Sequence, residues 1–327
     1  MNEPLSPKII YNQFLSREIN KQKAADLLTS LIEVSDNTKF RAKSIDLLEK
    51  IGIINNRGFK VLENCLISDE NAIVRASSVK LILNYYLDEG LTLLEWVIEH
   101  ERSPLVLKLI FDYVDNCSNQ KFKRIKKKIS DWNEKFSSLI RIVPEESRFF
   151  LDLEAIFAKD KENYEIEPTS YTHFKDLSDY KDGEPWLLIK NEHVHVLNYN
   201  YFNWKFIKEN REIIRSHLKL NDLKIYFKTI NKYNINTNNQ ELPPSISRLT
   251  HLRKLVLKRN YFRIIPSSIR RLSLLKELDL SHNALSKIPQ VLGSLNSLEI
   301  LNIKHNKVQN IPKSLKLFLN LLKEFQF

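Results

Sequence analysis

The chain has 327 residues, enough for two ordinary domains, because a single hydrophobic core seldom grows past about 250 to 300 residues. It contains 5 glycines, where an average usage of about 7% would give about 23. It carries neither the dinucleotide-binding nor the P-loop glycine motif, which excludes the usual nucleotide sites. Two cysteines leave no disulfide framework and no multi-cysteine zinc motif. The start of the chain lacks signal-peptide features and no long apolar segment follows, so we expect a cytoplasmic protein with no membrane span.

The net charge of +11 is distributed unevenly along the chain. Residues 1–200 hold 28 Lys and Arg against 32 Asp and Glu, a balance of −4, whereas residues 201–327 hold 23 against 8, a balance of +15. A basic surface of this kind attracts nucleic acid, anionic lipid or an acidic protein. Because Lys, Ile and Asn are abundant throughout, a coding bias explains part of the surplus equally well.

The first 120 residues contain a helical repeat. Residues 27–52 align with residues 62–86, and a third copy starts at Leu91. Apolar residues recur at helical spacing on both sides of a short acidic turn, which predicts a helix pair in each copy. The aligned turn residues are Ser35-Asp36 with Ser68-Asp69, followed by Arg41-Ala42 with Arg75-Ala76.

This pattern resembles short HEAT-like repeats, and we assign residues 1–120 to them. The resemblance implies that an Asp caps the second helix of each pair and that the Arg packs between neighbouring units. The third copy has Ser103-Pro104 at this point, which leaves its turn geometry open. A generic helical bundle is the alternative fold. Cys65 lies among apolar residues and is expected to be a packed core thiol.

Residues 121–160 are interpreted as a basic, amphipathic helical connector. Six of the eight residues in Lys121–Lys128 are basic. Apolar residues then recur along one predicted helix face, at Ile125, Ile129, Trp132, Phe136 and Ile140. Residues 161–185 are polar and turn-rich, which predicts a linker.

From Leu252 the sequence repeats with a period of 23 residues, in copies that begin at Leu252, Leu275 and Leu298. Each copy reads Leu-x-x-Leu-x-Leu-x-x-Asn-x-apolar-x-x-Ile-Pro, with conservative replacements. Alternating Leu predicts a short strand with one buried face. We expect the Asn amide to pair backbone groups that the turn would bury. The structural positions are Leu255, Leu257, Asn260 and Pro266, then Leu278, Leu280, Asn283 and Pro289, then Leu301, Ile303, Asn306 and Pro312.

These copies resemble leucine-rich repeats, specifically the 23-residue Ile-Pro type of Ras-suppressor-like proteins, and we assign residues 186–327 to them. The predicted fold is therefore a repeat solenoid, with all-α helix pairs followed by an α/β leucine-rich-repeat array. Trp186–Phe202 is predicted to be a hairpin or strand that caps the start. A degenerate copy precedes Pro243, and strand-like spacing recurs at Leu220–Ile225. At the far end the register slips by one residue, and the apolar rung at Phe325 and Phe327 needs a cover.

The resemblance places partner binding on the concave strand face. Basic residues are concentrated in the first copy, which predicts a charged edge within a broader polar surface, although a solvated sheet face is the alternative. The predicted partner-binding residues are Arg253, Lys254, Val256, Lys258, Arg259, Lys276, Glu277, Asp279, His282, Asn302, Lys304 and His305.

Neither a cofactor nor a catalytic motif is predicted. His193 and His195 alternate on a predicted strand, but no third ligand is nearby in the sequence, so we expect no metal there. His282 and His305 occupy equivalent positions in successive copies and would form a small basic stripe. No nucleophile elbow, H-E-x-x-H motif or recognisable catalytic carboxylate pair is present.

We therefore predict a non-catalytic protein-protein interaction scaffold or adaptor that uses the concave strand face and the helical repeats. The resemblance to the Ras-suppressor type implies that a small GTPase or its regulator is a candidate partner. The alternative is nucleic-acid or anionic-surface binding through Lys121–Lys128 and the basic carboxyl-terminal array.

Overall fold

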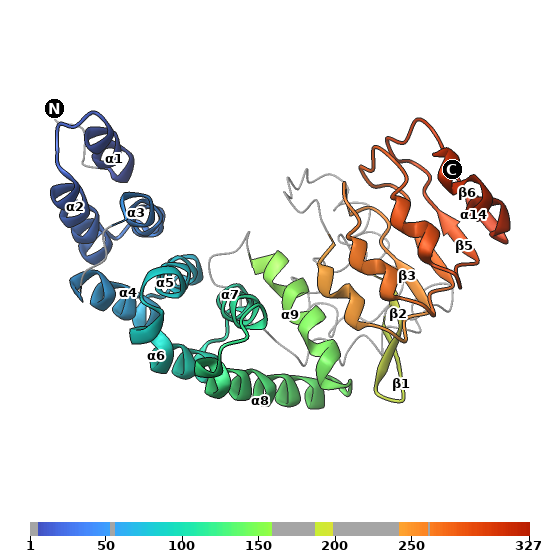
Figure 1. Ribbon diagram of the computed structural model, residues 1–327, viewed down its shortest axis with the longest axis horizontal. Helices are drawn as coiled ribbons and strands as arrows, with labels where there is room; N and C mark the ends of the chain where they lie inside the picture. The colour runs from blue at the N-terminus through green and yellow to red at the C-terminus, as the bar shows by residue number, and fades with distance from the viewer. Residues whose placement is uncertain (1–5, 53–55, 159–186, 199–241, 261) are drawn as a thin grey trace, which may run out of the picture. The chain divides into compact units, whose positions relative to one another are not determined.

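The computed structural model describes residues 6–52, 56–158, 187–198, 242–260 and 262–327 (Figure 1). The chain divides into two compact units, one of residues 1–132 with 151–166, the other of residues 133–150 with 167–327. The predicted boundaries at residues 120, 160 and 185 stay a prediction. The predicted linker and the strand-like spacings at residues 220–238 lie outside the described residues. Among the described helices, none combines the length and the apolar character that a membrane crossing requires.

The first unit is built from helices that follow one another along the chain, as Figure 1 shows in blue and cyan. The predicted helix pairs are confirmed as α2 with α3, α4 with α5, and α6 with α7. The helices are α1 (Pro7–Leu15), α2 (Lys21–Val34), α3 (Thr38–Ile51), α4 (Asn56–Ser68), α5 (Ala72–Tyr85), α6 (Leu87–His100), α7 (Pro104–Asp115), α8 (Lys123–Ile140) and α9 (Pro144–Ala158).

Asparagine caps the second helix of the first two pairs, so the expected Asp cap is wrong. The side chain of Asn37 accepts a hydrogen bond from the backbone N–H of Phe40 at the start of α3. Asn71 accepts from the N–H of Ile73 at the start of α5. An Asn oxygen satisfies the free N–H groups of a first helical turn as well as an Asp does. The acid two residues before the cap of the second pair, Asp69, is thereby available for another partner.

That partner is the arginine of the neighbouring helix pair, which confirms the expectation that arginine packs between units. Nε and Nη2 of Arg41 donate to the two carboxylate oxygens of Asp69 at 2.8 and 2.9 Å, and Nη1 donates to the carbonyl of Ser35 at 2.9 Å. Arg75 binds Glu101 in the same bidentate manner at 2.8 and 2.9 Å, with Nη1 on the carbonyl of Asp69. These pairs link successive turns across the helix array.

The third pair keeps this geometry although its sequence departs from the pattern. Glu101 occupies the place of Asp69, 32 residues later, and its longer side chain also accepts from the backbone N–H of Ser103. Pro104 then begins α7, where its missing N–H has no intrahelical partner to lose. The turn geometry of the third copy, which the sequence left open, is therefore held by Glu101.

The connector helix α8 is amphipathic as predicted. Phe122, Ile125 and Ile129 are buried in the core of the first unit, and the ring of Trp132 packs edge-on against Phe111 at 5.4 Å between centroids. The basic side chains lie on the other face. Three of them have partners: Lys121 binds Asp88, Lys128 binds Glu99, and Lys126 donates to the carbonyl of Cys117.

The second unit contains a six-stranded sheet in the order β1-β2-β3-β4-β5-β6. β1 and β2 form an antiparallel hairpin, and every later strand is parallel to its neighbour. The predicted capping hairpin is thus confirmed for residues 187–198. The elements are β1 (Leu187–Lys190), β2 (His193–Asn198), η3 (Pro244–Arg248), β3 (Lys254–Val256), η4 (Ser267–Arg271), β4 (Glu277–Asp279), η5 (Gln290–Ser294), β5 (Ile300–Asn302), η6 (Lys313–Leu315), α14 (Lys316–Leu321) and β6 (Glu324–Gln326).

Each 23-residue copy contributes one strand, one turn and one 3-10 helix, because its apolar positions point inward and its Pro stops the strand. Leu255, Leu278 and Leu301 lie opposite one another in register and are fully buried or nearly so. The register slip is confirmed, since Phe325 of β6 pairs with Leu301 at a spacing of 24 residues. Three large apolar side chains around this last rung are exposed, at Leu317, Leu321 and Phe327.

Asparagine amides hold the turns together, as the sequence predicts. Oδ1 of Asn283 accepts from the backbone N–H groups of Asn260 and Phe262 in the preceding copy at 3.1 and 2.9 Å. Its Nδ2 donates to the carbonyls of Leu257, Leu280 and Ser281. Asn306 repeats this pattern one copy later.

Candidate functional site

The strand face of the second unit presents two rows of outward side chains. The first row runs from Lys254 through Glu277 to Ile300, and the second from Val256 through Asp279 to Asn302. All six are partly exposed, whereas the leucine between them in each strand is buried. The parallel register therefore brings the predicted strand residues of three copies into one continuous surface.

Charges on this face are largely paired across neighbouring strands. Lys254 binds Glu277 at 2.8 Å. Glu299 is held between Lys276 and Lys323 at 2.8 and 2.7 Å, and the hydrogen bond from Lys276, with that from Lys323, lowers the pKa of Glu299 to about 2. The predicted basic edge is therefore narrower than the number of basic residues in the first copy indicates, since the charge of Lys254 is balanced by Glu277 of the next copy.

Of the remaining predicted residues, Arg253 and Lys276 directly precede β3 and β4, whereas Lys258, Arg259, His282, Lys304 and His305 follow the strands. Arg259, His282 and His305 are equivalent residues of successive copies and all have positive φ, between 55° and 62°. The rings of His282 and His305 stack at 4.1 Å between centroids. Burial, together with the charges of His305 and Arg259, lowers the pKa of His282, so His282 gains charge only at a lower pH than free histidine would.

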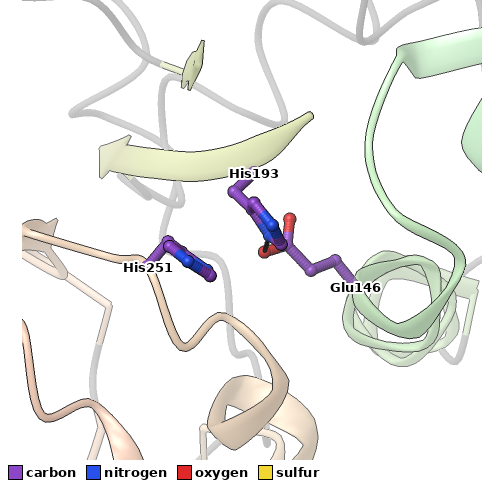
Figure 2. Close-up of side chains that lie close together, drawn as sticks. All are labelled: Glu146, His193 and His251. Atoms are coloured by element: carbon purple, nitrogen blue, oxygen red, sulfur yellow. Dashed lines mark hydrogen bonds and ion pairs between the residues drawn. The ribbon is translucent and has the colours of Figure 1, made fainter. Parts of the chain in front are cut away.

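A second feature of this unit is a cluster of histidines around a buried glutamate (Figure 2). His193 begins β2, and its Nδ1 lies 3.1 Å from Oε1 of Glu146 in α9. The other carboxylate oxygen of Glu146 accepts from the backbone N–H of Val194 at 3.0 Å. The ring of His251, in the turn after η3, stacks on His193 at 3.7 Å between centroids. His195 lies 6.1 Å from the His251 ring.

Burial dominates the electrostatics of this cluster. Only 1% of the Glu146 side chain is exposed, and this desolvation raises the pKa of Glu146 even though Val194 and His193 donate to it. Desolvation and the neighbouring charge of His193 lower the pKa of His251, and desolvation with the charge of Arg253 lowers the pKa of His195. These pKa shifts favour the neutral forms of Glu146, His195 and His251, while His193 is paired with Glu146.

Sequence reasoning identified His193 and His195 but missed Glu146 and His251. Glu146 lies 47 residues before His193 in the sequence, and His251 lies in a turn that carries no ligand motif. The tertiary fold brings these residues together, and spacing along the chain gives no signal of it.

A groove of about 690 Å³ lies at the turns of the first helix pairs. It is lined by polar groups that include the Arg41–Asp69 ion pair, and by the apolar side chains of Ile32 and Val61. Its lining also carries the acidic side chains of Glu33, Asp36 and Glu70, so the groove is acidic beyond the Arg41–Asp69 pair.

Cys65 lines this groove with 9% of its surface exposed, and desolvation by burial raises the pKa of its thiol to about 11. The thiolate, which is the reactive form, is therefore about a thousandfold less populated than the thiol at pH 8. We expect iodoacetamide to modify the half-buried Cys117 in the folded chain and to reach Cys65 only after unfolding in urea. Peptide mass spectrometry reports both sites, and equal labelling rates in the folded chain would contradict the packed-thiol assignment.

A comparison with protein families agrees with the repeat described for the second unit. The family model described as leucine rich repeat matches residues 250–308. These residues are leucine-rich repeats. A solved structure of a leucine-rich-repeat protein of Leptospira interrogans is 30% identical over 26% of this chain, with a TM-score of 0.23. The match spans 21% of that protein, about a fifth of its length. No curated protein matches significantly.

The leucine-rich repeats provide a rigid support for the strand face. Their leucine core and asparagine turns fix the strands, while the outward positions are partly exposed. Leucine-rich repeats commonly mediate protein-protein interaction.

Proposed function

We propose that this chain is a non-catalytic scaffold or adaptor whose leucine-rich-repeat strand face binds a protein partner. The observation that carries the proposal is the pair of outward rows on β3, β4 and β5. In each row, an apolar side chain, Val256 or Ile300, lies beside charged and amide groups. Apolar and polar side chains mixed on one accessible surface are the composition found at protein interfaces.

The helix pairs of the first unit supply a second surface in this proposal. Their arginine-acid links resemble those of HEAT-like repeats, and the groove lined by Ile32, Val61 and the Arg41–Asp69 pair is accessible. A cytoplasmic location fits this role. The resemblance to the Ras-suppressor type makes a small GTPase or its regulator the first partner to test.

Nucleic-acid binding through Lys121–Lys128 is the less favoured function. Lys121, Lys126 and Lys128 already have partners within the chain, at Asp88, the Cys117 carbonyl and Glu99. A phosphate backbone would have to compete with these contacts.

Replacing basic residues of the strand face tests the scaffold proposal. The triple variant Arg253→Ser, Lys258→Ser and Arg259→Asn removes three charges, and Asn tolerates the positive φ at position 259. We expect a partner isolated with the wild-type chain to bind this variant at least about tenfold more weakly, as measured by titration with the purified partner.

The matched control removes three charges from the return segment of the same copy, by Ser replacement of Arg263, Arg270 and Arg271, all of them exposed. Its affinity should stay near wild type. Equal losses in both variants, together with a steep fall in affinity as salt rises, would show attraction by net charge and would contradict a strand-face site.

A further inference from the structure

Three segments distant in sequence place metal-ligating side chains together in the second unit. Glu146 comes from α9, His193 from the first position of β2, and His251 from the turn between η3 and β3. Figure 2 shows the Glu146 carboxylate directed at the ring of His193, with the ring of His251 beside it. Each residue offers one ligand atom, and these three atoms all lie within 4.8 Å of one another.

The cluster is preorganised by contacts that a surface group of histidines lacks. Glu146 is held by the backbone N–H of Val194 at 3.0 Å, and only 1% of its side chain is exposed. A buried carboxylate is costly unless a cation or hydrogen-bond donors compensate its charge. His193 and His251 are each partly exposed, so an ion and its remaining ligands can approach from solvent.

We propose that Glu146, His193 and His251 form a binding site for Zn²⁺. Two imidazole nitrogens and one carboxylate oxygen are a donor set that Zn²⁺ prefers, at bond lengths of about 2.0 to 2.2 Å. Tetrahedral coordination at those lengths needs donor atoms about 3.3 Å apart. Rotation of the two partly exposed imidazoles brings the donor atoms from their present separations to that distance, and a water molecule is the fourth ligand.

The second stacked histidine pair of the chain shows what the carboxylate adds. His282 and His305 stack at 4.1 Å, much as His193 and His251 do at 3.7 Å. Among the residues that the structure describes, however, the potential metal group contains Glu146, His193 and His251 and does not include this second pair. The proposal therefore assigns the metal to one pair and not to the other.

A bound ion would join the helix segment of the second unit to the capping hairpin and to the first leucine-rich copy. These three segments are separated in the sequence by residues 159–186 and 199–241, which lie outside the described residues. A site built from such distant parts of the chain stabilises their association when the ion binds, because the ligands converge only in the folded unit.

The test uses the full chain without a polyhistidine tag, freed of metal by dialysis against a chelator. Competition with a chromophoric zinc chelator measures stoichiometry and affinity. We expect one Zn²⁺ per wild-type chain, and at least a tenfold weaker affinity for each of the variants Glu146→Gln, His193→Asn and His251→Asn. The matched control His282→Asn, from the other stacked pair, should bind as the wild type does.

Thermal unfolding separates a lost ligand from a lost fold. Zn²⁺ should raise the melting temperature of the wild type and of His282→Asn, and should leave that of His251→Asn unchanged. His251 lies in an exposed turn, so its replacement by Asn should preserve the fold in the absence of metal. Wild-type binding no tighter than that of His251→Asn overturns the proposal, and so does an equal loss of affinity in His282→Asn.

Discussion

Asn283→Ala is expected to unfold the leucine-rich-repeat array locally, with a loss of about 3 to 5 kcal/mol in its free energy of opening. The amide is 8% exposed and makes five hydrogen bonds to backbone groups of two successive copies. Alanine replaces none of them, and each buried group left without a partner costs about 1 to 3 kcal/mol. Hydrogen exchange followed by mass spectrometry measures the loss in peptides from residues 252–303.

The matched control for this substitution is Asn296→Ala, in the same copy. Asn296 is exposed, and its backbone N–H donates to the carbonyl of Ser294, a hydrogen bond that alanine retains. Its effect should stay within about 0.5 kcal/mol. Similar exchange rates in the two variants would argue that the Asn283 amide does not support the turns.

Arg75→Ala is expected to destabilise the helix pairs by about 2 to 4 kcal/mol. The substitution leaves Glu101, whose side chain is 6% exposed, without its bidentate partner, and it removes the donor to the carbonyl of Asp69. Breaking such a pair costs more than the pair itself contributes, because one charge stays buried. Exchange in peptides from residues 72–115 reports the loss.

Arg57→Ala is the control for the arginine prediction. Its ion pair with Glu33 is exposed, at 59% and 43% of the two side chains, and exposed pairs contribute about 0 to 1 kcal/mol. A loss for Arg75→Ala no larger than that for Arg57→Ala would mean that the links between turns carry no stability. For the control, exchange is followed in peptides that contain residues 33 and 57, in the same experiment.

The leucine-rich array was predictable because its rules are local. The buried strand face and the stop at Pro depend on residues within one copy, and the turn amide joins adjacent copies of the same repeat, so the 23-residue spacing predicted the buried leucines and the role of Asn283. The helix pairs were predictable for the same reason. Their turns were less predictable. The helix caps are Asn37 and Asn71, and Asp69, which was expected to be a cap, binds Arg41, 28 residues before it.

The charge pairing and the histidine cluster depend on long-range placement that no spacing encodes. Lys254 has an acid opposite it only because β3 and β4 are in register. Glu146 meets His193 only because α9 packs beside the capping hairpin within the second unit. A pattern search along the chain finds residue types, whereas these contacts depend on which elements become neighbours.

The asparagine bonds also give the array a direction. Each amide accepts from the backbone of the copy before it: Asn283 serves Phe262, and Asn306 serves Leu285. A copy is therefore completed by the one that follows, and its own turn is not a self-sufficient folding unit. The stability of each turn therefore depends on the copy that follows it. Local opening of the copy at Leu298 exposes the turn of the copy at Leu275, whereas opening of the copy at Leu275 disturbs the turn of the copy at Leu298 less.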